Sequence, residues 1–266
     1  MRTIIAHGHI FKNAGTTFDW SLKRNFGIDF IDHRDDKSMR RGGADYLDDF
    51  LMKNENIKAI SSHHLCLPLP KNVGYNILPC YILRNPILRI KSVYDFEVQQ
   101  KSDSLGAKTA KNLNFLEYCI WRMKEDIPPT IRNYQTLYLS GVKKRPLNYF
   151  DYSNAVQYVK KTNLVGLVER YDESMVLFEE EFRKKGISLD LSHKKQNVIY
   201  DGNLPISNRI DLILEELSEK ANFIIAKNLY DLRLYAKMCI LFEERIKKIP
   251  EFYLKLKSYR DRCSML

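Results

Sequence analysis

Residues 9–18 have the types and the spacing that phosphate binding requires, because they read His-Ile-Phe-Lys-Asn-Ala-Gly-Thr-Thr-Phe. An apolar run precedes this segment, at residues 3–6, and a stretch with helical character follows at residues 18–26. A strand, a loop with a lysine and a glycine, and two threonines that open a helix together form a phosphate cradle. The first N–H groups of such a helix point at the anion, and the helix dipole favours negative charge there.

The order of residues in this loop differs from the Walker A motif. That motif has a glycine, four further residues and then Gly-Lys-Ser/Thr. Here the lysine precedes the glycine, in the order Lys12, Gly15, Thr16, Thr17. A lysine at this place meets the ligand from the other side of the loop, which argues against an ordinary ATP or GTP site.

A second segment with chemical potential starts at Arg84, where the apolar run of residues 77–83 ends. Pro86 suits the first turn of a helix. Ser92 lies eight residues beyond Arg84, which corresponds to about two helical turns. Arginine offers forked donors that suit a phosphate, and serine can add one hydrogen bond. Taken alone, the segment also fits a surface arginine followed by an unrelated helix serine.

The elements that must position these residues alternate between short apolar runs and helical patterns. Such alternation predicts an α/β fold, a parallel sheet flanked by helices with a helical C-terminal part. Ligands bind at the carboxyl ends of the strands in these sheets, where the Lys12 loop and Arg84 both fall. Strands are expected at residues 3–10, 28–31, 57–61, 77–83 and 164–168, helices at residues 15–26, 44–52, 86–100, 112–125, 152–161, 172–185, 209–221 and 229–248, and a loop at residues 137–151.

The composition is that of a globular protein and does not identify a ligand. The chain has 266 residues, 44% of them hydrophobic and 29% charged, and no Gly/Ser linker or repeat divides it, so one domain, residues 1–266, is expected. The net charge of +10 permits an anionic ligand, a nucleic acid or an acidic membrane surface, but no nucleic-acid recognition motif is present. Without a run of about 18 apolar residues or a signal-peptide pattern, we expect no membrane span and a cytoplasmic location.

The five cysteines are scattered and form no CxxC pair, so the sequence indicates neither a zinc site nor a disulfide framework. Cys80 and Cys119 lie in apolar surroundings and are expected in the core. The last four residues, Cys263-Ser264-Met265-Leu266, fit a prenylation signal, but so short a match also arises by chance. Whether the chain is ever lipidated stays open.

Taken together, the two segments resemble the paired phosphate-binding motifs of the sulfotransferases that use 3′-phosphoadenosine 5′-phosphosulfate (PAPS). The resemblance is closest to the branch with carbohydrate enzymes such as the heparan sulfate sulfotransferases and their bacterial relatives. Their motifs read roughly His-Ile-Pro-Lys-Thr-Ala-Gly-Thr-Thr and Leu-Arg-Asp-Pro-x-x-Arg-x-x-Ser-x-Tyr, and this chain departs from them at Phe11, Asn13 and Asn85. Residues 165–172 and 228–235 are similar to less specific parts of the family.

The resemblance implies a P-loop-NTPase-like fold, PAPS as the sulfate donor, adenosine 3′,5′-bisphosphate (PAP) as the product and no metal. It implies that Lys12 stabilises charge on the oxygen between sulfur and the 5′-phosphate, and that Arg84 and Ser92 hold the 3′-phosphate. The basic residues 192–198 are expected to close over the nucleotide or to be a solvated charge run. The expected donor-binding set is Lys12, Asn13, Ala14, Gly15, Thr16, Thr17, Arg84, Ser92 and Lys195.

An acceptor hydroxyl must lose its proton, and histidine suits that task near neutral pH. His63 and His64 follow a predicted strand, at the place where the family has its base. Neighbours in an extended segment point to opposite faces, so we expect one of the two to face the acceptor and prefer His63. His7 and His9 share a strand face, but no acidic or cysteine partner is evident nearby, so they are interpreted as structural.

The sequence therefore favours transfer of a sulfuryl group from PAPS to an acceptor hydroxyl, with a saccharide or glycan as the expected acceptor. Two other functions remain open, a non-catalytic nucleotide-binding protein and a small-molecule kinase with an altered P-loop. The position of Lys12 and the pairing of Arg84 with Ser92 argue against the kinase. Neither the acceptor nor the oligomeric state can be read from the sequence.

Overall fold

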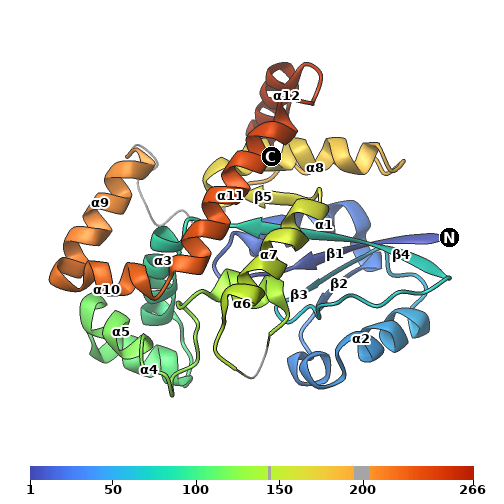
Figure 1. The fold of residues 1–266 in the computed structure, drawn as a ribbon. Helices are drawn as coiled ribbons and strands as arrows, with labels where there is room; N and C mark the ends of the chain where they lie inside the picture. Colours follow the sequence, from blue (N-terminus) through green and yellow to red (C-terminus); the bar gives the residue numbers. More distant parts are fainter. Residues whose placement is uncertain (143–144, 195–203) are drawn as a thin grey trace.

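The structure, a computed structural model, describes residues 1–142, 145–194 and 204–266. Within these residues, parallel strands form one sheet in the order β2-β3-β1-β4-β5 (Figure 1). The predicted α/β architecture, with its parallel sheet, flanking helices and helical C-terminal part, is confirmed. The strands are β1 (Arg2–Gly8), β2 (Phe30–His33), β3 (Ala59–Ser62), β4 (Tyr75–Leu83) and β5 (Val165–Leu167).

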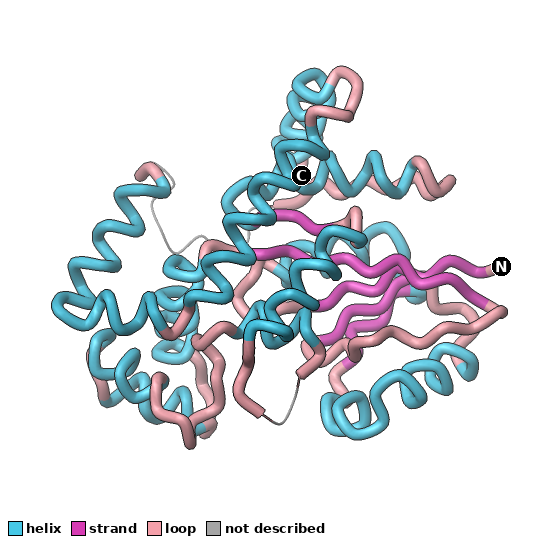
Figure 2. Tube along the Cα trace, viewed as in Figure 1, coloured by secondary structure: helices cyan, strands magenta, loops and turns pink. Residues whose placement is uncertain are grey.

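Helices lie on both sides of this layer of strands, as Figure 2 shows. Short 3-10 turns, η1 (Gly27–Asp29), η2 (Val168–Arg170) and η3 (Ser218–Lys220), join some of the elements. The helices are α1 (Gly15–Phe26), α2 (Asp36–Lys53), α3 (Pro86–Gln99), α4 (Leu105–Asn112), α5 (Phe115–Arg122), α6 (Tyr134–Ser140), α7 (Tyr149–Lys161), α8 (Tyr171–Arg183), α9 (Ile206–Leu217), α10 (Ala221–Ala226), α11 (Leu229–Ile246) and α12 (Phe252–Ser264).

The sheet is buried on both faces. Ile4, Ile5 and Ala6 of β1 are all almost fully buried, as the continuous apolar run of a covered parallel strand predicts. In Figure 1, α7 and α11 cross the near face and α1 lies behind the sheet. The helices α3, α4, α5, α9 and α10 gather beyond the end to which the strand arrows point. They therefore stand at the carboxyl ends of the strands, beside the predicted site.

A second hydrophobic cluster, separate from the core around the sheet, holds this group of helices together. Val93 of α3 packs there with Phe115 and Tyr118 of α5. Next to it, Glu97 and Arg122 form a buried ion pair with an N–O distance of 2.5 Å. Breaking such a pair leaves an uncompensated buried charge, so this contact fixes the far end of α3 against α5.

The prediction of a loop at residues 137–151 is wrong, because α6 covers its beginning and α7 its end. The start of α6 is stabilised from a distant part of the chain. The carboxylate of Asp231, in α11, accepts hydrogen bonds from the backbone N–H groups of Gln135 and Thr136 at 3.0 and 2.7 Å. A cap supplied across 95 positions leaves no local signal in the sequence.

Other predicted elements also have different bounds, such as the helix predicted at residues 209–221, which is α9, η3 and the start of α10. The helix predicted at residues 112–125 is the shorter α5, which starts at the capping box formed by Asn114 and Glu117, and α4 before it was not predicted. The helix predicted from residue 44 begins at Asp36, and its predicted start coincides with a kink at Gly43. The second strand begins two residues later than expected because η1 occupies residues 27–29.

Cys80 and Cys119 are fully buried, so their predicted place in the core is confirmed. Among the described residues, no helix combines the length and the apolar character that crossing a bilayer would require.

Candidate active site

The loop between β1 and α1 has an unusual backbone conformation. Lys12 and Ala14 both have positive φ angles, 63° and 58°, which residues with a side chain rarely adopt. Asn13 lies between them with 1% of its surface exposed. Its Nδ2 donates to the carbonyl of Ile82 at 2.8 Å and to Oε1 of Gln135 at 2.7 Å. The side chain of Asn13 thus anchors the bent loop to the end of β4.

The ammonium of Lys12 lies 4.4 Å from the ring centroid of Phe96, in α3. Burial and the nearby Arg84 guanidinium lower the pKa of Lys12 to about 8, although Asp95 opposes the shift. A desolvated ammonium beside another cation is poised to bind an anion, because an anion offsets both unfavourable effects.

Arg84 lies directly after β4 and contacts the loop. Its Nη1 donates a hydrogen bond to the backbone carbonyl of Lys12 at 3.0 Å. The backbone of Arg84 is held by Gln135, whose Oε1 accepts from the Arg84 N–H and whose Nε2 donates to the Arg84 carbonyl, both at 2.9 Å. Gln135 therefore joins both predicted phosphate-binding segments, and sequence reasoning missed it because it is distant from both.

The helix that follows Arg84 starts as predicted. Pro86 occupies its first turn, and Asn85 caps it, since Asn85 Oδ1 accepts from the backbone N–H groups of Ile87 and Leu88. The residue that departs from the family motif here keeps the capping function of an aspartate. Ser92 follows along the same helix and is 8% exposed.

Arg89, a member of the same motif, donates a hydrogen bond to the backbone of the loop between β1 and α1. It is 1% exposed, and its Nε donates to the carbonyl of Phe11 at 3.0 Å. Its Nη1 donates to the carbonyl of Thr130 at 2.9 Å, and its guanidinium lies 4.4 Å from the ring centroid of Tyr134. Burial lowers the pKa of Arg89 to about 10. Arg89 therefore joins the loop between β1 and α1 to the segment before α6.

A cavity of about 510 Å³ opens beside the start of α1, and we call it the arginine cavity. The structure brings Ala14, Thr17 and Arg84 together in its wall, whereas Lys12, Gly15, Thr16 and Ser92 do not line it. The other lining residues are mainly charged or polar and come from η2, α8, α9 and α12 and their flanks: Val168, Glu169, Arg170, Tyr171, Asp172, Glu173, His193, Ile206, Arg209 and Arg260.

Carboxylates moderate the positive charge of this cavity. Arg260 pairs with Asp172 at 3.1 Å, and Arg170 pairs with Glu173. Glu169 accepts hydrogen bonds from the Asn85 N–H and the Tyr235 hydroxyl at 3.0 and 2.7 Å. Burial raises the pKa of Glu169, while the Tyr235 hydroxyl and Arg84 oppose this shift.

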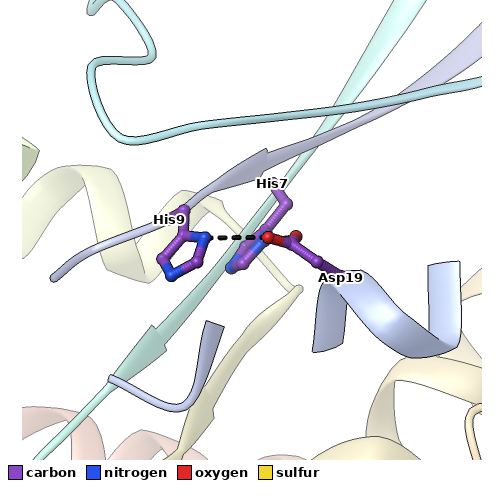
Figure 3. A group of neighbouring side chains, drawn as sticks. All are labelled: His7, His9 and Asp19. Carbon is purple, nitrogen blue, oxygen red and sulfur yellow. Dashed lines mark hydrogen bonds and ion pairs between the residues drawn. The ribbon is translucent and has the colours of Figure 1, made fainter. Parts of the chain in front are cut away.

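Three buried residues at the end of β1 form a hydrogen-bonded cluster, shown in Figure 3. The Asp19 carboxylate, in α1, accepts from Nδ1 of His7 at 2.7 Å and from Nδ1 of His9 at 2.8 Å. The two imidazoles are stacked with centroids 5.2 Å apart. The interpretation that His7 and His9 lack an acidic partner is therefore wrong. Asp19 follows Gly15 by one helical turn, so both residues lie on the side of α1 that contacts His9.

This cluster explains why residue 15 is a glycine. A Cβ on Gly15 would lie 2.4 Å from Nε2 of His9, closer than any real contact allows. The imidazole of His9 thus packs directly on the backbone at the start of α1. The sequence analysis assigned Gly15 to close approach of a phosphate, and the structure adds this second steric reason.

His63 and His64 have different surroundings. His63 Nδ1 donates to the backbone carbonyl of His9 at 2.9 Å, and the two imidazole centroids are 4.1 Å apart. His64 lies 3.7 Å from the Asp36 carboxylate. Burial, followed by the nearby His9, lowers the pKa of His63 below its usual 6.5. His63 is therefore the histidine that lies next to the Lys12 loop through its bond to His9.

A further cavity of about 490 Å³ adjoins His64, and we call it the aromatic cavity. Thr130 and Tyr134, both in contact with Arg89, belong to its wall, so Arg89 links this cavity to the loop. Its remaining lining residues are largely apolar: Arg40, Leu65, Leu67, Pro128, Pro129, Leu137, Tyr138, Gly141 and Val142. Of the candidates for closing over the nucleotide, Lys194 is exposed, and Lys195 and Asn197 lie outside the described residues.

No model of a known protein family matches this chain. A protein from Archaeoglobus fulgidus, described only as uncharacterized, is 27% identical over 251 residues that cover 91% of this chain and 98% of the other. A sulfotransferase from Alicyclobacillus acidocaldarius of known crystal structure has 15% identity and a TM-score of 0.42, over 88% of this chain and 96% of that chain. At these values the likeness assigns no activity to the present protein.

Proposed function

We propose that this protein transfers a sulfuryl group from PAPS to a hydroxyl of an acceptor. The observation that carries the proposal is the meeting of the two phosphate-binding segments. Arg84 and Lys12, 72 positions apart, are joined by a hydrogen bond, and Arg84 shares the arginine cavity with Ala14 and Thr17 at the start of α1. A donor with phosphates at both its 5′ and 3′ positions needs two such anion sites close together.

The proposed chemistry depends on positioning and on charge stabilisation. The bond between sulfur and the oxygen of the 5′-phosphate breaks, and a bond forms between sulfur and the acceptor oxygen. The Lys12 ammonium stabilises the negative charge that the leaving phosphate gains. Thr16, Thr17 and the N–H groups that open α1 hold the 5′-phosphate, and Arg84 with Ser92 holds the 3′-phosphate. These steps use no metal.

His63 is the proposed base that takes the proton of the acceptor hydroxyl. A carbonyl oxygen only accepts, so the bond to His9 places the proton of neutral His63 on Nδ1 and leaves a lone pair on Nε2. Because its pKa is lowered, His63 is neutral at pH 7 and able to accept a proton. His64 is the alternative, and its Nε2 lies 3.7 Å from the Asp36 carboxylate.

The aromatic cavity is the proposed acceptor site. Its described wall includes His64, the alternative base, and not His63, and Arg89 connects this wall to the loop that carries Lys12. Its aliphatic and aromatic walls suit an acceptor that has an apolar face beside its hydroxyl. The saccharide or glycan that the family resemblance implies remains the expected acceptor class, bound through its less polar face.

Nucleotide binding tests the proposal and its alternatives. We expect PAP to raise the melting temperature of the protein more than ATP or AMP does, because only PAP carries the 3′-phosphate. Labelled PAPS with a panel of saccharides and phenols then identifies the acceptor. A shift with ATP but none with PAP would reject the proposal in favour of a kinase. PAP binding without transfer to any acceptor would favour a non-catalytic nucleotide-binding protein.

A further inference from the structure

We infer that Asp19 and His9 act together as a positioning unit for His63, and that they couple the base to the helix that opens at the phosphate site. The inference rests on the proposed role of His63 as base. Neither Asp19 nor His9 is expected to touch the donor or the acceptor. Their contribution is to hold the imidazole of His63 in one orientation and one tautomer.

The contact between Asp19 and His9 fixes the imidazole of His9. Oδ2 of Asp19 accepts from Nδ1 of His9 at 2.8 Å, and both residues are buried. Burial would raise the pKa of Asp19, but the hydrogen bonds and charges of His7 and His9 hold it below its usual range. Asp19 is therefore a carboxylate that accepts two N–H bonds, and the His9 ring cannot rotate without breaking one of them (Figure 3).

The His9 ring lies between the start of α1 and the imidazole of His63. On one side it packs against the backbone of Gly15, where an added Cβ would overlap its Nε2 and Cδ2. On another side it packs against His63, with ring centroids 4.1 Å apart and planes tilted by 43°. The backbone carbonyl of His9 also accepts the Nδ1 proton of His63. His9 thus contacts the start of α1 with its ring and controls His63 with both its ring and its carbonyl.

Several neighbouring groups change the pKa of His63. His9 and Arg34 lower the pKa of His63, while Asp36 and the hydrogen bond to the His9 carbonyl raise it, and burial is the largest effect. Burial also lowers the pKa of His9 itself, against the hydrogen bond to Asp19. Two imidazoles in contact cannot both be charged at low cost. Asp19 holds His9 through its Nδ1 proton, so the His9 ring stays packed against His63 and keeps water away from it.

Asp19→Asn is the decisive substitution because it keeps the size of the side chain. An asparagine has only one oxygen acceptor, so it leaves either His7 or His9 facing an N–H group instead of an oxygen. When His9 loosens, His63 becomes better hydrated. The burial that lowers its pKa then weakens, and the pKa rises towards about 6.5. Nitrogen-15 NMR of labelled histidines, recorded against pH, measures the tautomer and the midpoint for His63 directly.

We expect Asp19→Asn to mix the tautomers of His63 and to raise its titration midpoint. With an acceptor in hand, kcat should fall roughly 10- to 100-fold, the scale of a misplaced catalytic group, while the affinity for PAP changes little. Ser61→Ala is the matched control, because Ser61 contacts Nδ1 of His7 at 3.1 Å and leaves the bond between Asp19 and His9 intact. It should leave His63 unchanged.

A double-mutant cycle tests whether Asp19 acts through His9. His9→Phe keeps a ring in the same place but cannot bond to Asp19, so Asp19→Asn should add no further effect in that background. Additive effects would overturn the inference, as would an Asp19→Asn protein whose His63 titrates as in the wild type. The NMR readout needs no turnover. If the wild type transfers no sulfuryl group, the proposed function fails, and the titration still decides whether Asp19 positions His63.

Discussion

Arg84 donates a hydrogen bond from Nη1 to the backbone carbonyl of Lys12 at 3.0 Å. The contact forms because β4 and β1 are neighbours in the sheet, so their carboxyl ends, and the residues that follow them, meet at one edge. Lys12 and Arg84 thereby contribute two cations to one region, and the repulsion between them is part of what lowers the pKa of Lys12. A ligand with two anionic groups would relieve that repulsion.

The 3′-phosphate assignment predicts a selective effect of Arg84→Ala. A hydrogen bond to a charged group is worth about 1.5–3 kcal/mol, so we expect the affinity for PAP to fall at least about 10-fold. The affinity for AMP, which lacks the 3′-phosphate, should fall less. Isothermal titration measures both constants. Arg183→Ala, which removes an exposed side chain that pairs with Glu180, is the control. Equal losses for PAP and AMP would contradict the assignment and indicate a collapse of the loop.

The lowered pKa of Lys12 predicts a pH dependence of donor binding. Anionic ligands bind the ammonium form, and the free protein loses that proton as the pH rises through about 8. The affinity for PAP should therefore be highest below pH 8 and decline above it. Lys12→Arg should move this decline to higher pH, because arginine stays protonated. The affinity for PAP is measured between about pH 6 and 10 for the wild type and for Lys12→Arg. Identical profiles would exclude Lys12 as the titrating group.

The two histidines should differ when each is replaced. His63→Ala removes the proposed base, so we expect kcat to fall by about 10²- to 10⁴-fold, whereas His64→Ala should have a smaller effect that appears mainly in the KM for the acceptor. Because the pKa of His63 lies below 6.5, the wild type should retain its rate when the pH falls to 6.5 and lose it at lower pH. The reverse ranking of the two variants would assign the base to His64.

The contact between His9 and Gly15 predicts a cost in stability. An alanine Cβ at position 15 would lie 2.4 Å from His9 Nε2, so the buried ring must move. Overpacking of this kind costs about 1–3 kcal/mol, measured by urea unfolding monitored by circular dichroism. Gly74→Ala is the control, because the nearest atom to an added Cβ there, Oδ1 of Asn72, is 3.4 Å away, an ordinary contact distance. An unchanged free energy of unfolding for Gly15→Ala would show that His9 has room to relax.

Local signals in the sequence were enough to predict the elements that carry the candidate phosphate-binding residues. The apolar runs of β1 and β4 specify buried strands, and Asn85 with Pro86 specifies the start of α3. The loop with Lys12 and the strand end at Arg84 could also be placed at the carboxyl edge, because parallel strands bring their ends together. These features depend on neighbours in sequence, and for that reason spacing and residue type reveal them.

The sequence by itself determined the alternation of strands and helices and indicated the two candidate phosphate-binding segments. Only the tertiary structure decided how they are held. Gln135 bonds to Asn13 and Arg84 across 122 and 51 positions, and Asp231 caps α6 from 95 positions away. Asp19 pairs with His7 and His9 only because α1 folds back over the end of β1. Such contacts depend on which surfaces pack together, and no local spacing encodes them.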